Sequence, residues 1–267
     1  MVARDAAVTS TREGANLMRT LGSIWSWLAI ALVVVIGFCI QAVLAVLTLP
    51  FDRRRYVTGR FFRRMAVTAS WMIPSWRFGV HGPVPRGGPQ GRTVVVSNHQ
   101  SNADPFLISF LPWEMKWLGK ASLFRGPFFG WSMWLAGDIP VERGQKDSAL
   151  AAMDKCRAWL DRGVPVMIFP EGTRSKDRQL LPFKSGAFRL AIDAGADILP
   201  IAVEGTHDAL PKHSWKFGYA NARVAVGTPI KTAGQTVDSL KEQAKAQIEA
   251  LLVDLRAAQP TEQAIAT

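Results

Sequence analysis

The chain has 267 residues, a formal net charge of +11 and a pI near 10.2. This length favours one domain with an appendage, and the positive charge calls for an anionic partner. Anionic lipid fits better than nucleic acid, because the basic residues form no recognised nucleic-acid-binding motif. Cys39 and Cys156 lie far apart, which excludes a disulfide framework and provides no metal site.

The first notable element is an uncharged run from residue 21 to residue 50. A helix needs about 20 apolar residues to cross a bilayer, so this run is long enough to span one. The alternative is a helix or helical pair that enters one leaflet without crossing. A cleaved secretory signal is disfavoured because the apolar run is too long. A buried helix of a soluble protein is disfavoured because the run lacks charge over its whole length.

A basic flank follows the apolar run. Its six arginines are Arg53, Arg54, Arg55, Arg60, Arg63 and Arg64. By the positive-inside rule they place the flank and the following domain on the cytoplasmic face of the cell (inner) membrane. They can also hold anionic lipid headgroups. Residues 66–76 form a second apolar stretch, too short to span and suited to an interfacial helix.

The composition divides the chain into three parts. Residues 1–80 are the expected membrane-anchoring segment with its basic flank. Residues 81–92 are rich in Gly and Pro and lead into a domain that we expect to cover residues 81–260. Residues 261–267 are expected to be a flexible tail.

A polar turn follows the first predicted strand of this domain, residues 93–96. Pro105 suits the first position of the next helix, which places Asp104 at the N-cap. His99 precedes Asp104 by five residues, so the two side chains can meet across a turn but not along one helix. A His oriented by a carboxylate is the arrangement that a general base needs. The alternative is that Asp104 only caps its helix.

An aromatic segment covers residues 113–134 and contains Lys116, Lys120 and Arg125. Its aromatic residues are Trp113, Trp117, Phe124, Phe128, Phe129, Trp131 and Trp134. This mixture suits a wall that meets acyl chains and headgroups. It equally suits an ordinary core whose lysines extend their charged ends to solvent.

Two further strands are predicted to end in polar residues. Residues 137–143 form a short strand that ends at Arg143, whose guanidinium suits a phosphate. The alternative is a surface arginine paired with Glu142 or Asp138. After a predicted helix over residues 146–163, the buried strand 164–169 leads into the Glu171–Arg174 turn. Ligand sites lie beyond the carboxyl ends of parallel strands.

The remaining elements complete an alternating pattern of strands and helices. A helix ends near residue 195, the strand 198–203 contains Pro200, and a short strand covers residues 223–226. Six apolar residues then trace one helix face: Val237, Leu240, Ala244, Ile248, Leu251 and Leu255. His207 and His213 are expected to face solvent. The pattern predicts an α/β fold with a mixed, mostly parallel sheet flanked by helices.

Four segments in this order resemble the signatures of the PlsC-like 1-acyl-sn-glycerol-3-phosphate (lysophosphatidic acid) acyltransferases. The first is Asn-His-x-Ser-x-x-Asp at residues 98–104, and the second runs from Gly137 to Arg143. The third is Pro-Glu-Gly-Thr-Arg-Ser at residues 170–175, and the fourth is the strand with Pro200. The second departs from the family at Glu142, where an apolar residue or Asp is usual.

The resemblance implies a glycerolipid acyltransferase-like fold and a role in phospholipid biosynthesis. The enzyme would transfer a fatty acyl group from acyl-CoA or acyl-carrier protein to the sn-2 hydroxyl of 1-acyl-sn-glycerol 3-phosphate, forming phosphatidic acid. The expected partners are lysophosphatidic acid, the acyl donor and anionic membrane lipids, with no nucleic acid, resident cofactor or metal.

The resemblance also assigns roles to individual residues. His99 would be the base and Asp104 would orient it. The acceptor phosphate would be held by Arg143, Arg174 and Lys120. The substrate-binding loop would be Glu171, Gly172 and Thr173, and Pro200 would support the acyl channel.

Three other functions stay open at this point. The acceptor can instead be glycerol 3-phosphate, a lyso-ornithine lipid or another lysophospholipid, because each would use the same base. A non-catalytic membrane lipid-binding protein could reuse the fold. A serine hydrolase is disfavoured because the sequence contains no Gly-x-Ser-x-Gly motif.

Overall fold

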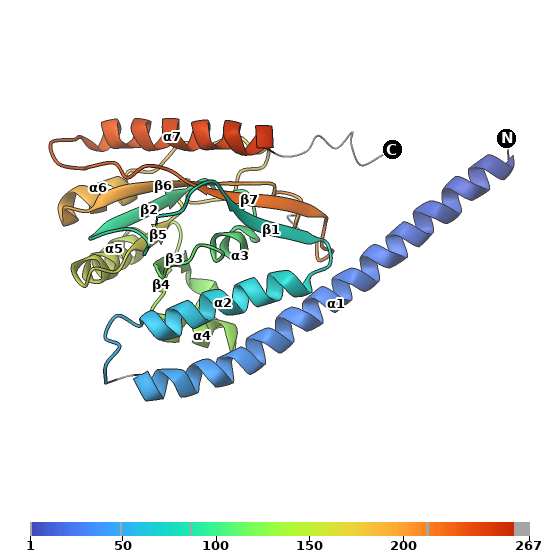
Figure 1. The fold of residues 1–267 in the computed structure, drawn as a ribbon, viewed down its shortest axis with the longest axis horizontal. Coiled ribbons are helices and arrows are strands. Elements are labelled where there is room, and N and C mark those ends of the chain that lie inside the picture. The colour runs from blue at the N-terminus through green and yellow to red at the C-terminus, as the bar shows by residue number, and fades with distance from the viewer. Residues whose placement is uncertain (1, 49, 86, 212–213, 259–267) are drawn as a thin grey trace.

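The computed structural model describes residues 2–48, 50–85, 87–211 and 214–258 (Figure 1). The helices are α1 (Val2–Thr48), α2 (Tyr56–Met72), α3 (Asp104–Ile108), the 3-10 helix η1 (Ala121–Arg125), α4 (Phe129–Ala136), α5 (Lys146–Asp161), α6 (Gly186–Ala194) and α7 (Val237–Ala258). The strands are β1 (Trp76–His81), β2 (Thr93–Ser97), β3 (Lys116–Lys120), β4 (Ile139–Val141), β5 (Val166–Ile168), β6 (Asp197–Glu204) and β7 (Ala220–Val226).

The described strands form one seven-stranded sheet in the order β1-β7-β6-β2-β5-β3-β4. Only the β6–β7 pair is antiparallel, and the other neighbouring pairs are parallel. The central strands are short apolar runs buried on both faces, as a covered parallel sheet requires. Because β2, β3, β4, β5 and β6 all run in the same direction, their carboxyl ends meet at one edge of the sheet. The predicted mixed, mostly parallel α/β fold is confirmed.

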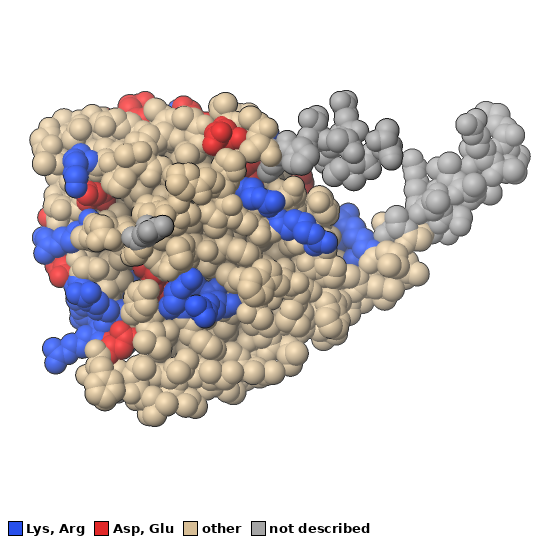
Figure 2. All heavy atoms as spheres, viewed as in Figure 1, with Lys and Arg blue, Asp and Glu red and all other residues tan. Residues whose placement is uncertain are grey.

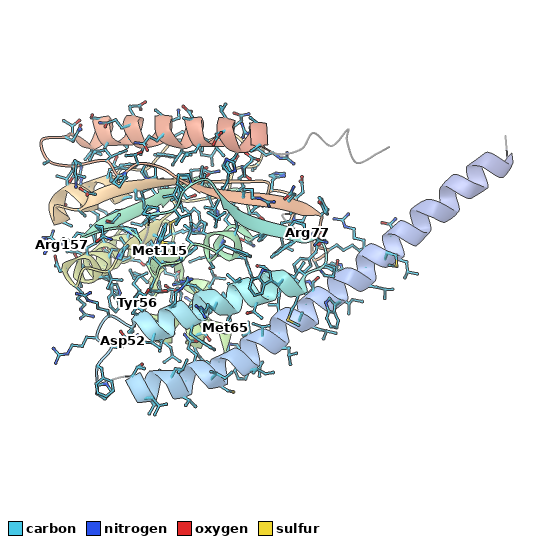
Figure 3. All side chains as sticks on the ribbon, viewed as in Figure 1. Asp52, Tyr56, Met65, Arg77, Met115 and Arg157 are labelled. Carbon is cyan, nitrogen blue, oxygen red and sulfur yellow. The ribbon has the colours of Figure 1, made fainter. Side chains whose placement is uncertain are left out.

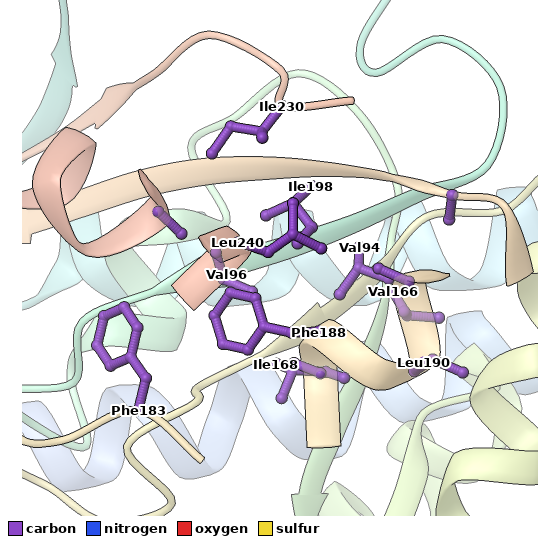
Figure 4. Packing of buried hydrophobic residues seen from close by; sticks show 14 of the residues in the cluster. Val94, Val96, Val166, Ile168, Phe183, Phe188, Leu190, Ile198, Ile230 and Leu240 are labelled. Carbon is purple, nitrogen blue, oxygen red and sulfur yellow. The ribbon is translucent and has the colours of Figure 1, made fainter. Parts of the chain in front are cut away.

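Helices cover both faces of this sheet (Figure 1). Val94 and Val96 point to one face, where they pack with residues of α5, α6 and α7 such as Cys156, Phe188 and Leu240 (Figure 4). Val95 points to the opposite face and packs with residues of α3 and β3. This division follows from the alternation of side chains along a strand. The two core layers hold β2, and the turn that follows it, in a fixed position.

The long helix α1 lies against α2 and α4 (Figure 1). Gly37 of α1 meets Met65 of α2, which Figure 3 labels, and a Cβ at position 37 would come within 2.5 Å of the Met65 methyl carbon. The Gln41 side chain donates hydrogen bonds to the carbonyls of Thr58 and Ser132, at 3.0 and 3.1 Å. In Figure 2 the surface over α1 carries almost no charged side chain. By length and composition, its segment Asn16–Thr48 can cross a membrane.

A buried ionic cluster joins α2 to the sheet. Arg63 of α2 pairs with Asp138 and lies 3.8 Å from Glu114, and Glu114 pairs with Lys116 at 3.1 Å. Burial raises the pKa of Glu114 and lowers that of Lys116. Lys116 is fully buried, so the alternative of a core whose lysines extend their charged ends to solvent is wrong for this residue. The cluster fixes α2, and through it α1, to the domain.

The helix predicted over residues 66–76 is wrong in its bounds. Helix α2 begins at Tyr56, where the Asp52 carboxylate accepts the backbone N–H groups of Tyr56 and Val57 at 2.8 and 2.7 Å. It ends at Met72, two residues before Pro74, since a proline disfavours helical geometry in the residue before it. Residues 76–81 form β1, for which the sequence analysis predicted no strand. The division at residue 80 stays a prediction.

The aromatic segment is neither wholly core nor wholly surface. Trp113, Trp117 and Phe124 are buried, whereas Trp131 and Trp134 of α4 are each 46% exposed. Strand β3 lies within this segment and was not predicted from the sequence. Its first residue, Lys116, is charged, so the sequence gives no sign that this position is buried. The first part of the segment therefore belongs to the core, and contact of its exposed aromatic residues with acyl chains and headgroups stays a prediction.

Candidate active site

Polar side chains from five parallel strands gather at the carboxyl edge of the sheet. His99 follows β2, Lys120 ends β3, and Arg143 follows β4. Glu171 follows β5 and Thr206 follows β6. Segments that are distant in sequence therefore meet at the edge where open α/β sheets place their ligands.

His99 and Asp104 form a buried pair. The Nδ1 atom of His99 lies 2.7 Å from Oδ2 of Asp104, whose side chain is fully buried. The same Oδ2 accepts the backbone N–H groups of Gln100 at 2.7 Å and Ser101 at 3.0 Å, and Oδ1 accepts the hydroxyl of Thr206. An ionised carboxylate only accepts hydrogen bonds, so Nδ1 carries the proton and Nε2 is left to accept one.

The sequence analysis predicted Asp104 as the N-cap of its helix, and this prediction is wrong. The N-cap is Ala103, and Asp104 is the first residue of α3. The Asp104 carboxylate turns back toward the residues before the helix, where His99, Gln100 and Ser101 offer donors. The geometry favours the orienting function of this carboxylate over the capping one.

The imidazole of His99 is fixed on its other sides as well. It stacks on the ring of Phe169, with centroids 4.1 Å apart and planes at 19°. Its backbone N–H donates to Glu171 at 2.8 Å, and its carbonyl accepts the N–H of Ser175 at 2.9 Å. The preceding Asn98 exchanges two hydrogen bonds of 2.9 Å with the backbone of Val203. Together these contacts hold the backbone around His99 and restrict its imidazole ring to one orientation.

Glu171 orders the loop beside His99. Its carboxylate accepts the backbone N–H groups of His99 at 2.8 Å and Leu181 at 3.3 Å. Burial, helped by the nearby charge of Asp104, raises the pKa of Glu171 to about 7, although its two hydrogen bonds oppose the shift. Glu171 therefore titrates near neutral pH.

Arg143 and Arg174 lie close enough to repel one another. Partial burial lowers the pKa of Arg143, and the charge of Arg174 lowers it further. The acidic residues predicted as alternative partners of Arg143 are engaged elsewhere, since Glu142 pairs with Arg125 at 2.6 Å and Asp138 pairs with Arg63. Within the described ranges neither Arg143 nor Arg174 forms an ion pair, which leaves both guanidinium groups available to an anion.

The remaining predicted residues have clear positions. Lys120 and Thr173 are exposed. Gly172 has φ of +70°, and a Cβ there would lie 2.7 Å from Nζ of Lys184, so only glycine suits this turn. Pro200 is buried in the middle of β6, opposite Val96 of β2.

The sequence analysis assigned no role to four residues beside the site: Asn98, which it noted only as part of the first signature, and Phe169, Lys184 and Thr206. Thr206 could have been found, because it follows a predicted strand as the other site residues do. The contacts of Asn98 with Val203 of β6 and of Phe169 with His99 join segments that are distant in sequence, so they have no local pattern. His207 is partly exposed, as predicted, with 31% of its side chain accessible, and its ring contacts Asp208 at 2.8 Å and the Lys176 carbonyl at 3.2 Å. His213 lies outside the described residues.

Comparison with known proteins decides the family. An acyltransferase family model matches residues 77–204. A 1-acyl-sn-glycerol-3-phosphate acyltransferase of Haemophilus influenzae is 33% identical over 185 residues, which cover 67% of this chain and 76% of that protein. The human 1-acyl-sn-glycerol-3-phosphate acyltransferase alpha is also 33% identical, over 74% of this chain and 71% of that protein. The chain belongs to the 1-acyl-sn-glycerol-3-phosphate acyltransferase family.

Membership of this acyltransferase family confirms the resemblance found in the sequence. A relative in Chlamydomonas reinhardtii is 36% identical over 65% of this chain but only 52% of its own length. This chain therefore spans about half the length of some curated relatives. The crystal structure of the LPA acyltransferase PlsC from Thermotoga maritima superposes with a TM-score of 0.76 at 23% identity, covering 92% of this chain and 99% of that one. It shares the fold.

Proposed function

We propose that this acyltransferase is a 1-acylglycerol-3-phosphate O-acyltransferase, which acylates the sn-2 hydroxyl of lysophosphatidic acid to form phosphatidic acid. The observation that carries the proposal is the buried His99–Asp104 pair at the same sheet edge as Arg143 and Arg174, which form no ion pair with any residue that the structure describes. Membership of the family supports it, because the relatives named above carry this activity in their names.

The proposed reaction is a direct transfer in which His99 is the base. Nε2 of His99 takes the proton of the sn-2 hydroxyl, and the oxygen attacks the thioester carbonyl of the acyl donor. The tetrahedral intermediate collapses, an ester forms, the carbon–sulfur bond breaks, and the leaving thiolate takes the proton from His99. Asp104 keeps Nδ1 protonated and stabilises the imidazolium that forms between these steps. The proposed chemistry needs no resident cofactor or metal.

The acceptor phosphate is the proposed ligand of the basic residues at this edge. Arg143 and Arg174 would bind its oxygens through paired N–H donors, and Lys120 would add a third charge. The loop of Glu171, Gly172 and Thr173 would hold the glycerol part, where Gly172 permits a close approach of the backbone. Holding the phosphate positions the sn-2 hydroxyl against His99. Pro200 remains the proposed support of the acyl channel.

The acyl donor is proposed to be acyl-CoA or acyl-carrier protein, since both present the same thioester. The basic surface of the chain, with its net charge of +11, suits either anionic carrier. Parallel assays with the two donors distinguish them, because their thioesters are chemically alike and only the carrier differs.

The long apolar helix indicates membrane association, and we propose that α1 lies in one leaflet without crossing. Arg19 donates to the Phe217 carbonyl at 3.1 Å, and Gln41 donates to Ser132. At 1.5 Å per residue these contacts are roughly 33 Å apart along α1, about the thickness of the hydrocarbon core. A spanning α1 would draw the domain itself through the bilayer. The basic flank favours the cytoplasmic face.

Labelling of an introduced cysteine tests the placement of α1. Val8→Cys, in a Cys39→Ser background, should react with an impermeant thiol reagent only from the side on which the domain lies. Labelling from the opposite side would establish a spanning helix.

The assay that tests the proposed reaction compares wild type with His99→Ala in membranes. Labelled oleoyl-CoA is offered with lysophosphatidic acid and, in parallel, with glycerol 3-phosphate and a neutral lysolipid. We expect acylation of lysophosphatidic acid alone, abolished by His99→Ala. Preference for another acceptor would overturn the assigned substrate and the phosphate-binding role. Inactivity of folded, membrane-bound protein with every acceptor and both donor types would favour a lipid-binding protein.

A further inference from the structure

A second basic site lies at the opposite edge of the sheet from His99. A hollow of about 870 Å³ is formed by the α1–α2 connection, the turn before β2 and the end of α5. Five arginines line it: Arg53, Arg54, Arg55, Arg92 and Arg162. Strands β2 and β5 begin beside this hollow and end at the candidate active site, so the two sites are separated by the length of the strands.

The two carboxylates of the hollow are already engaged. Asp52 accepts the N–H groups at the start of α2, and Asp161 pairs with Arg92 at 3.2 Å and Arg157 at 3.3 Å. Among the described residues, Arg53, Arg54 and Arg162 form no ion pair. Neighbouring cations without counter-charges repel one another, and a bound anion would relieve that repulsion.

An exposed apolar surface borders the hollow. Val46, Leu47 and Phe51 are 74%, 65% and 83% exposed at the end of α1 and just beyond it. On another side Arg55 donates to the carbonyl of Trp134, whose side chain is 46% exposed. In Figure 2 basic side chains gather at the left of the molecule, directly above the uncharged surface of α1. A ligand that fits both regions carries an anionic group and an apolar tail.

We propose that this hollow binds the phosphate-monoester headgroup of a membrane lipid of the phosphatidate class, at a site separate from the reaction centre. Such a headgroup carries between one and two negative charges at neutral pH, which would offset part of the charge of Arg53, Arg54 and Arg162, three arginines without an ion pair in the described part of the chain. A guanidinium group can bind a phosphate through two parallel N–H···O hydrogen bonds. The acyl chains would remain in the leaflet beside Phe51 and Leu47. The site would tether this end of the protein to membranes that contain its ligand.

The experiment counts the lipids retained by the detergent-solubilised full chain in native mass spectrometry. The probe is dioctanoyl phosphatidate, and the site variant is Arg54→Gln/Arg162→Gln. The matched control, Arg77→Gln/Arg189→Gln, removes the same charge at exposed positions away from the hollow. Dioctanoyl phosphatidylcholine tests the need for a phosphate monoester, and glycerol 3-phosphate tests the need for acyl chains.

Wild type and control should bind one more phosphatidate than the site variant does, with at least a tenfold loss of that affinity in the variant. Phosphatidylcholine should not fill the hollow, and basal acyltransfer should be unchanged. Equal binding by wild type and site variant, or equal losses in variant and control, would overturn the proposal. Equally tight binding of glycerol 3-phosphate would overturn its assignment to a lipid.

Discussion

The carboxylate of Asp104 accepts hydrogen bonds from His99, Gln100, Ser101 and Thr206. These donors fix both oxygens, so the carboxylate presents one lone-pair direction to Nδ1 of His99. A general base needs this fixed tautomer more than it needs proximity alone. At the residue scale, the site therefore depends on how rigidly Asp104 is held.

Asp104→Asn should lower kcat by on the order of a thousandfold, because an amide can donate to Nδ1 and so favours the wrong imidazole tautomer. Thr206→Val removes only one of the four donors and should cost about tenfold. Steady-state kinetics on membranes of matched protein content measures both. Nearly full activity of Asp104→Asn would contradict the assigned role.

Arg143→Gln should act on acceptor binding. A hydrogen bond to a charged group contributes about 1.5–3 kcal/mol, so kcat/KM for lysophosphatidic acid should fall by roughly 10- to 150-fold, chiefly through KM. For a neutral lysolipid the same change should have little effect. Equal losses for charged and neutral acceptors would show that Arg143 does not read the phosphate.

Glu171 predicts a dependence of stability on pH. Its pKa is about 7 in the folded protein and about 4.3 in an unfolded chain. Between these values the unfolded chain loses its proton first, so the free energy of unfolding falls as pH rises and stays lowered above pH 7. Relative to Glu171→Gln, which does not titrate, wild type should lose on the order of 1 kcal/mol between pH 5 and pH 8 after solvent screening.

Thermal unfolding in detergent at a series of pH values measures this difference. The melting temperatures of wild type and Glu171→Gln, plotted against pH, should diverge as pH rises, with wild type losing stability relative to the variant. Parallel curves for wild type and variant would show that the pKa of Glu171 is not raised.

At the scale of elements, α2 joins the membrane-facing helices to the sheet. Gly59 of α2 faces the buried ionic cluster, and a Cβ at this position would lie 2.2 Å from an oxygen of Glu114. The helix thus approaches Glu114, Lys116 and Asp138 closely enough for Arg63 to reach Asp138. Single charges in such a cluster are costly, and they are stable only together.

Arg63→Met should destabilise the protein by about 3–5 kcal/mol, because it leaves Asp138 and Glu114 buried with one cation fewer. Arg64→Met, its exposed neighbour on α2, is the matched control and should cost less than 1 kcal/mol. Melting temperatures in detergent compare the two. Equal melting temperatures would show that the cluster contributes nothing to the docking of α2.

At the scale of the whole molecule, an apolar surface runs along α1. Leu28 and Leu32 are 63% and 53% exposed, as expected of a helix that contacts lipid. Leu150 on α5 is exposed to a similar degree, 57%, on a different part of the surface. The two cases differ in position: Leu28 and Leu32 lie on the long apolar helix, whereas Leu150 is a single exposed leucine on a helix rich in charged residues.

Leu28→Glu/Leu32→Glu should therefore move the protein from the membrane to the soluble fraction, since each charge costs about 2–4 kcal/mol in the hydrocarbon region. Leu150→Glu should leave it in the membrane fraction. Centrifugal fractionation measures both. Retention of the α1 variant in membranes would show that another surface carries the membrane affinity.

The sequence by itself determined the fold class, the order of the central elements and which polar residues follow the central strands, while the roles of those residues stay predictions. It could do so because β2, β5 and β6 are short apolar runs whose polar residues follow at the carboxyl end. The apolar face of α7 was also predicted from the sequence, and its residues Leu240, Ala244, Ile248 and Leu255 are all buried. These features are local and periodic, so residue order alone carries them.

Only the tertiary structure decided which charges are paired, where the edge strands lie and where Asp104 points. Lys116 has the composition of a surface residue, but it is buried in an ionic cluster. Glu114 of this cluster is close to Lys116 in sequence, whereas Arg63 and Asp138 are distant in sequence. Residues 76–81 alternate Trp, Phe and Val with Arg, Gly and His, a strand pattern that the sequence analysis overlooked, and pairing with β7 places this strand at the edge of the sheet. The arginine hollow is assembled from three separate segments. Such features depend on contacts between distant residues, and local patterns do not encode them.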